Sequence, residues 1–209
     1  MTTENPDLQA PAGAVRLINA TLASIHAHGL CATTVDTICQ HSGLSRGMIR
    51  HCFSSKENLI GETYRYLGDI WKWEALARRQ RFQRGDRAEL YALVEDMFST
   101  QNFDPVRISA WFALSAAAAS DVELRAVNHA IYAEVRTNAC EIFAAVSKAE
   151  NRKIDSWKQA CVLTALADGL WLQHLLDSDS ISAEMAIDVC RQFIDSSLAA
   201  TNNDARFAG

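Results

Sequence analysis

The sequence predicts an all-α protein of about nine helices. Its 209 residues include only 9 glycines and 3 prolines, about half the share of an average soluble protein, so few turns interrupt the chain. Apolar residues recur at spacings of three and four, which is typical of amphipathic helices. No run of β-branched and aromatic residues alternates with polar ones as a strand requires.

Composition limits the classes of protein that the chain can represent. Hydrophobic residues make up 49% and charged residues 22%, values that exclude a disordered tail, a collagen-like chain and a small disulfide scaffold. The net charge of −5 argues against a uniformly basic nucleic-acid coat, but it permits a local DNA-binding surface. Residues 1–60 hold four basic and four acidic groups, so the excess acid lies in residues 61–209.

Cysteine spacing and the composition of the amino terminus bear on cofactors and location. The six cysteines form no C-x-x-C or C-x-x-H pattern, so we expect no metal ion and no cofactor. Residues 1–12 lack the apolar run of a signal peptide, and no stretch approaches the length of a membrane span. We therefore expect a cytoplasmic protein with reduced cysteines and no membrane partner.

The first sixty residues are predicted to form an arm and three short helices. Two prolines lie in a polar segment without periodicity, which predicts a flexible N-terminal arm over residues 1–12. An amphipathic helix follows from residue 14. Thr34 can cap a second helix, Gly43 interrupts the chain after it, and Ser45 can cap a third.

The remainder of the chain is predicted to form six longer helices. Apolar periodicity continues through it, with interruptions at Gly85 and before Pro105. The predicted helices cover residues 56–84, 87–99, 106–119, 121–149, 154–176 and 182–199. No internal repeat of fixed period is visible, which argues against a helical solenoid.

Residues 33–59 carry the pattern on which the functional prediction depends. Two short helices are joined by a tight Ser-Gly-Leu-Ser connection, as in a helix-turn-helix, whose second helix enters a major groove about 12 Å wide. Residues 44–56 contain three basic groups and no acid. The predicted DNA-binding residues are Thr34, Ser45, Arg46, Gly47, Arg50, His51 and Lys56. The expected partner is therefore double-stranded DNA.

This segment resembles the TetR family of transcriptional regulators. Nine residues match the family pattern at its fixed spacing: Thr34, Ile38, Gly43, Ser45, Gly47, Ile49, Phe53, Lys56 and Leu59. The resemblance implies a three-helix DNA-binding domain over residues 13–60 and a larger ligand-binding and dimerisation domain over residues 61–209. Family members often have aromatic residues where this chain has Arg50 and Cys52. We expect Arg50 to contact phosphate or guanine instead, and Cys52 to contribute little.

Two stretches of the larger domain, residues 110–113 and 167–172, resemble the betaine-regulator (BetI) branch of that family. The ligand implied by that branch is choline, a quaternary ammonium compound that aromatic faces can hold. The predicted ligand-binding residues are Trp73, Trp111, Phe112, Asp168 and Trp171. The same tryptophans can equally fill the interior of a large helical domain.

The last two predicted helices are expected to form a subunit interface. Residues 154–176 are apolar on more faces than one subunit can cover, which is typical of an obligate interface. In the family the last two helices of each subunit pair, so we expect a homodimer through residues 154–176 and 182–199. A two-fold dimer matches a palindromic operator. The leading hypothesis is a repressor that a small-molecule effector releases from DNA.

Two other functions remain open. An enzyme could use Asp168, His174 and Glu184 as acid–base groups, but the sequence has no Gly-rich phosphate loop and no nucleophile motif. A helical adaptor that binds only protein would not need the hydrogen-bond donors on and beside the second helix of the helix-turn-helix, namely Ser45, Arg46, Arg50 and Lys56. Five arginines between residues 78 and 87 also suggest nucleic-acid binding, although a solvated face or ion pairs with acids on later helices are favoured.

Overall fold

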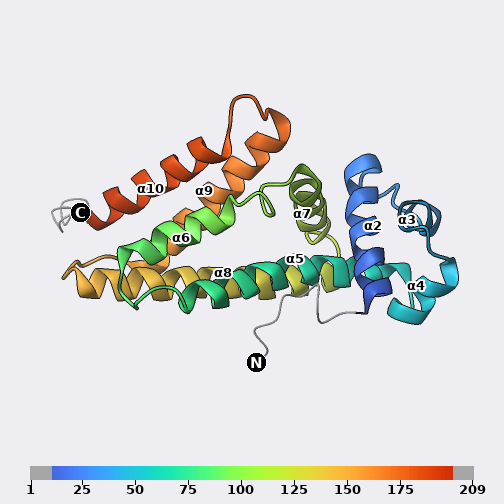
Figure 1. Ribbon diagram of the computed structural model, residues 1–209, viewed down its shortest axis with the longest axis horizontal. Coiled ribbons are helices and arrows are strands. Elements are labelled where there is room, and N and C mark those ends of the chain that lie inside the picture. Colours follow the sequence, from blue (N-terminus) through green and yellow to red (C-terminus); the bar gives the residue numbers. More distant parts are fainter. Residues whose placement is uncertain (1–10, 200–209) are drawn as a thin grey trace. The chain divides into compact units, whose positions relative to one another are not determined.

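The computed structural model describes residues 11–199, which form nine helices and no strand (Figure 1). The all-α prediction is thus confirmed. The helices are α2 (Ala12–His28), α3 (Val35–Ser42), α4 (Arg46–Phe53), α5 (Lys56–Arg79), α6 (Arg87–Met97), α7 (Pro105–Ala117), α8 (Val122–Ala149), α9 (Ser156–Leu176) and α10 (Ala183–Ala199). Most of the predicted arm lies outside the described residues. Among residues 11–199, no helix is long and apolar enough to cross a membrane.

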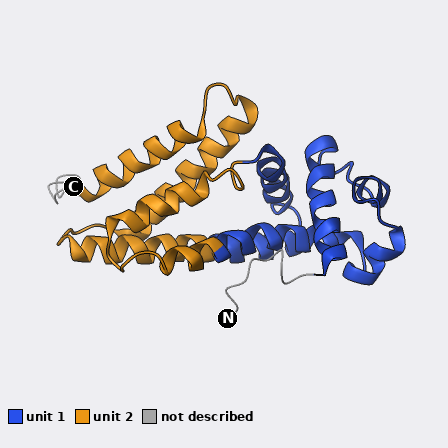
Figure 2. Cartoon of the chain, viewed as in Figure 1, with its two compact units in different colours: residues 1–73, 104–132 blue, residues 74–103, 133–209 orange. Residues whose placement is uncertain are grey.

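Two compact units share the chain, and each is built from separate segments (Figure 2). The first unit contains residues 1–73 and 104–132, and the second contains residues 74–103 and 133–209. Helices α5 and α8 therefore each contribute to both units. The predicted domain boundary at residue 60 does not coincide with a boundary between these units, and it stays a prediction.

Helix α2 is the central support of the first unit. It packs against α3, α4 and α7, and it buries Leu17, Leu22 and Ile25 almost completely. Burial of each such aliphatic side chain contributes about 1.5–3 kcal/mol. Near its end, His26 Nδ1 lies 2.9 Å from Ser109 Oγ of α7. The same helix therefore holds the short helices α3 and α4 and anchors them to α7.

Most helix boundaries lie within two residues of the predicted ones, and the end of α5 differs by five. Helix α2 begins at Ala12, two residues before the predicted start, because Pro11 supplies a φ of −54° at the N-cap and has no amide hydrogen to satisfy. Helix α5 ends at Arg79 instead of continuing to residue 84. The chain turns through Gly85, which has a φ of +95°, a conformation that glycine adopts readily. No proline or glycine marks the end at Arg79, so the composition gave no signal for it.

Ion pairs connect the helices of the second unit. Arg87 Nη2 lies 2.5 Å from Glu150 Oε2, and its Nη1 lies 2.8 Å from Asp195 Oδ1 of α10. Hydrogen bonding from Arg87 holds the pKa of Glu150 below its ordinary value. Arg78 is buried and pairs with Asp96 of α6. Arg79 Nη2 also lies 2.6 Å from Glu141 Oε2 of α8. The expectation that arginines of this region pair with acids on later helices is confirmed for these three.

Candidate nucleic-acid interface

Thr34 fixes the beginning of α3. Its hydroxyl accepts a hydrogen bond from Thr37 N at 3.2 Å, and its own amide donates to Thr37 Oγ1 at 2.9 Å. This reciprocal arrangement is a capping box, which satisfies two amide groups that the helix cannot. The Thr34 side chain is thereby held in place, and its predicted contact with DNA stays a prediction.

Gly43 makes the tight turn between α3 and α4. Its backbone is left-handed, with a φ of 65° and a ψ of 19°, a conformation that side-chain-bearing residues adopt at a cost. A Cβ atom at this position would also lie 3.0 Å from Arg16 Nη2. Both the conformation and the space favour glycine. The turn therefore places the start of α4 directly after the end of α3.

Helix α4 is anchored by its apolar side. Ile49 is buried beside α2, as is Ile38 of the preceding helix. Val35 and Phe53 are half-buried at the margins of this small core. Because residues three and four apart lie on one face of a helix, Ile49 and Phe53 share the inner face of α4, whereas Arg50 and His51 are exposed. The helix thus presents its polar face to solvent.

Four predicted DNA-binding donors lie on that exposed face or at its start. Ser45, Arg46, Arg50 and His51 are all exposed. Ser45 occupies the N-cap position of α4, yet its side chain forms no capping hydrogen bond. Arg46 pairs with Asp36 of α3. The amino-terminal end of a helix attracts phosphate groups because its amides and its dipole both favour an anion.

Gly47 and Lys56 differ from these donors. Gly47 is exposed in α4, and a Cβ atom there would meet no atom of the protein closer than Ser45 Oγ, at 3.6 Å. Internal packing therefore does not explain the glycine. Lys56 is half-buried and its Nζ donates to Thr33 O at 3.4 Å. Its ammonium has three hydrogens, so this bond leaves donors for a phosphate.

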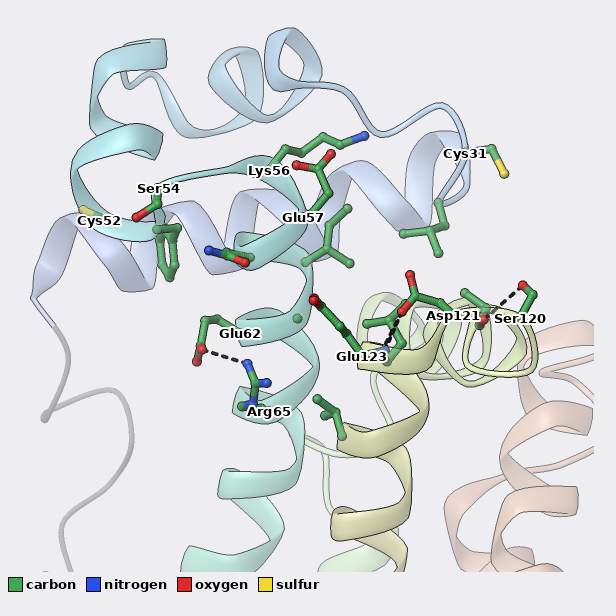
Figure 3. A pocket seen from close by; sticks show the side chains of 18 residues that line it. Cys31, Cys52, Ser54, Lys56, Glu57, Glu62, Arg65, Ser120, Asp121 and Glu123 are labelled. Carbon is green, nitrogen blue, oxygen red and sulfur yellow. Dashed lines mark hydrogen bonds and ion pairs between the residues drawn. The ribbon is translucent and has the colours of Figure 1, made fainter.

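A hollow of about 830 Å³ lies where α4 ends and α5 begins (Figure 3). Its wall on the other side is the start of α8 with the end of α7. The charged lining residues have both signs: Lys56, Glu57, Glu62, Arg65, Asp121 and Glu123. Arg65 Nη1 lies 2.8 Å from Glu62 Oε1. The lining includes none of the five predicted ligand-binding residues, so the hollow does not correspond to the predicted effector site.

Trp111 of α7 is the centre of an aromatic cluster in the first unit. Its ring centroid lies 5.1 Å from that of Tyr64, 4.5 Å from that of Trp71 and 5.5 Å from that of Tyr132. Trp111 is 2% exposed, and its Nε1 has no hydrogen-bond partner among the described residues. An unpaired buried indole N–H is unfavourable.

The other predicted ligand-binding residues are divided between the units. Trp73 and Phe112 belong to the first unit, while Asp168 and Trp171 lie on α9 in the second. Trp171 is buried, and its Nε1 donates to Met97 O at 3.1 Å. A cage formed by all five residues stays a prediction. Tyr64 was not predicted, although its spacing of seven from Trp71 places both on one face of α5.

The short helices α3 and α4, with the exposed donors of α4, define a helix-turn-helix DNA-binding protein. Comparison with protein families supports this class. Residues 17–63 match the model described as bacterial regulatory proteins, tetR family. Residues 86–199 match the BetI-type transcriptional repressor C-terminal domain. The chain therefore belongs to the TetR family, with a BetI-type C-terminal domain. It is a DNA-binding transcriptional repressor and not an enzyme.

Similar proteins of known sequence and structure agree with this assignment. The HTH-type transcriptional regulator BetI of Paraburkholderia xenovorans is 32% identical over 187 residues, which cover 88% of this chain and 92% of that protein. The Burkholderia cenocepacia regulator of the same name is 34% identical over 192 residues, with 88% and 93% coverage. A transcriptional regulator structure from Pseudomonas aeruginosa PAO1 has a TM-score of 0.80 and 26% identity, covering 95% of this chain and 97% of that one.

A further structure, from Saccharomonospora viridis, was solved in complex with choline. It has a TM-score of 0.78 and 20% identity, and it covers 88% of this chain and 96% of its own. At that identity the likeness concerns the fold.

Proposed function

We propose that the chain is a ligand-responsive repressor that binds a palindromic operator as a homodimer and is released by a small molecule. The observation that carries the proposal is the set of exposed donors on α4, a helix that the buried Ile49 anchors to the rest of the first unit. One such helix covers only a few base pairs, so a two-fold dimer is needed for a specific site. A regulator of this kind works beside the chromosome, hence in the cytoplasm.

Replacing Arg50 tests the DNA contact. Arg50→Ala is expected to weaken binding to the DNA upstream of the gene and to reduce the salt dependence of log Kd by about one unit per lost phosphate contact. Arg65→Ala is the matched control, because Arg65 is also an exposed arginine but lies on α5 and pairs with Glu62. Fluorescence anisotropy at several salt concentrations measures both. If the variant with both Arg50→Ala and Lys56→Ala binds this DNA as tightly as the wild type, the proposed DNA-binding function loses its main support.

Exposed apolar side chains on the last two helices support dimerisation. Trp157, Val162, Leu172 and Leu176 of α9 and Met185 of α10 are exposed large hydrophobic residues. A single chain rarely leaves such a set in contact with water unless a partner covers it. We propose that α9 and α10 of two copies pack together.

A charge placed on this surface tests the dimer. Leu172→Glu with Leu176→Glu is expected to give monomers by light scattering and to abolish operator binding. Val122→Glu is the control, since Val122 is 76% exposed, like Leu176 at 77%, but lies at the start of α8. If the variant with both α9 substitutions remains as dimeric as the Val122→Glu control, the proposed interface is contradicted.

The effector proposed for this chain is a quaternary ammonium compound such as choline. Support comes from the aromatic cluster around Trp111 and from the choline complex of a protein with the same fold. Aromatic faces attract such a cation, and the Trp111 indole N–H can donate to a hydroxyl oxygen. Coupling to DNA requires that the effector bind one conformation more tightly than the other.

Choline titration tests the effector. Choline chloride is expected to release operator DNA at concentrations where sodium chloride of equal ionic strength does not. Trp111→Phe keeps an aromatic ring but removes the N–H donor, so it should weaken choline binding measured by calorimetry while DNA binding persists. Choline that neither binds nor releases DNA would eliminate this effector.

A further inference from the structure

An ion pair joins the two helices of the helix-turn-helix at their amino-terminal ends. Arg46 is the first residue of α4, and Asp36 lies in the first turn of α3. Arg46 Nη2 lies 2.5 Å from Asp36 Oδ1, and the two side chains are 72% and 68% exposed. A predicted DNA donor thus has a carboxylate beside it, on a surface that is proposed to meet a polyanion.

The fold gains only a small stabilisation from Asp36 as an anion in the first turn of α3. Thr34 and Thr37 already cap α3 through both side chains, and ion pairs as exposed as this one contribute little to stability. For DNA binding the acid is unfavourable. Non-specific binding depends on the attraction between basic side chains and phosphate groups, and a nearby carboxylate weakens that attraction. The remaining role for Asp36 acts through Arg46.

We infer that Asp36 is a positioning residue that makes Arg46 a reader of bases, an inference that rests on the proposed DNA binding by α4. A guanidinium has five N–H donors in a fixed fork. One of them serves Asp36, and the other four still offer an edge that matches O6 and N7 of guanine in the major groove. The carboxylate holds this edge in one orientation. A guanine is therefore the expected base opposite Arg46.

The same carboxylate weakens incorrect complexes. Where the DNA offers Arg46 only phosphate oxygens, Asp36 competes for the guanidinium and repels the phosphate. Where guanine is present, both partners of Arg46 can be satisfied together. Specificity is a difference between two affinities, so a group that disfavours the wrong complex raises specificity even while it lowers overall affinity.

Glu57 provides a matched control. It is exposed and lies in the first turn of its own helix, α5, as Asp36 does in α3. No ion pair among the described residues involves Glu57. Asp36→Asn and Glu57→Gln each remove one negative charge from the first turn of a helix, but only the first releases Arg46.

The experiment compares the full-length wild type with Asp36→Asn, Glu57→Gln, Arg46→Ala and the Asp36→Asn, Arg46→Ala double variant. Wild type first selects its sequence from a random duplex library. Fluorescence anisotropy then gives Kd for the selected duplex and for a scrambled one. Asp36→Asn should bind the scrambled duplex more tightly and lower the ratio of the two affinities about fivefold or more, the lower end for one bidentate base contact.

Glu57→Gln should tighten both complexes and leave the ratio unchanged. In the Arg46→Ala background, Asp36→Asn should have no effect on the ratio, because the guanidinium on which it acts is absent. Asp36→Glu keeps the charge and should retain most of the wild-type ratio, and thermal melting confirms that each variant folds.

The outcomes separate the inference from the proposed function. A wild type that selects no sequence overturns the proposed DNA recognition and this inference with it. A wild type that selects a sequence while Asp36→Asn keeps the wild-type ratio overturns the inference alone. The inference also fails if Asp36→Asn lowers the ratio equally with and without Arg46.

Discussion

Replacement of Gly47 by alanine should separate the stability of α4 from its contact with DNA. Gly47 lies in the first turn of α4, where alanine is the better helix former by about 0.5 kcal/mol, the lower end of the usual range. The added Cβ would meet nothing closer than Ser45 Oγ at 3.6 Å, an ordinary contact. For a chain of this size the gain corresponds to a rise in Tm of about 1–2 °C.

The same methyl group is expected to weaken DNA binding. If α4 approaches the duplex closely at Gly47, the extra atom costs about 1–3 kcal/mol, as overpacking does in a protein interior. That energy corresponds to a Kd about 5- to 150-fold higher. Calorimetric melting and anisotropy on the selected duplex measure the two effects separately.

Gly61 of α5 offers the control for this prediction. A Cβ there would likewise meet only Arg65 Nη1, at 3.6 Å, so Gly61→Ala should raise Tm without changing Kd. Wild-type DNA affinity in Gly47→Ala would refute the close approach at Gly47. A lowered Tm would refute the assumption that the helix accepts the side chain.

Three further outcomes are expected. Gly68→Ala should destabilise the protein by about 1–3 kcal/mol in urea unfolding, because its Cβ would lie 2.6 Å from Ile131 Cγ1 and 2.9 Å from Ile131 Cδ1. Ile131→Val removes Cδ1 and should recover part of the loss, and full stability in the single variant would contradict the packing. Glu150→Gln should lower Tm at neutral pH. The difference from wild type should begin to shrink as the pH falls below the ordinary pKa of about 4.5 and disappear only below the lower pKa of the folded state, since Arg87 favours the charged form only in the folded protein; a constant difference would contradict this. Burial raises the pKa of Cys190 to about 12, so iodoacetamide should modify this thiol only after unfolding, as mass spectrometry can check.

The helix-turn-helix could be predicted because its signals are local. Thr34 caps α3 through a residue three positions away, and Gly43 is needed for a turn whose strain depends on its own backbone. The apolar spacing of Ile38 and Ile49 is visible in the sequence, and both are buried. Interactions over a few residues decide each of these features.

The partners of long side chains could not be predicted in the same way. Periodicity places Tyr64 and Trp111 on buried faces, but it does not say which buried faces meet. Likewise, Asp36 and Arg46 lie on different helices, and their pairing depends on the angle at which α3 and α4 pack. The sequence shows that both residues are charged, but it does not show that they form an ion pair. These features require the tertiary arrangement.

The first unit is built from two separate segments of the chain, and this affects how it forms during synthesis on the ribosome. Helix α2 packs against α7, and the unit continues to residue 132. Because translation adds about 5–20 residues per second, α2, α3 and α4 emerge several seconds before α7 exists. During that interval the face of α2 that contacts α7 remains uncovered. The helix-turn-helix is therefore made first, but the packing that supports it is completed late.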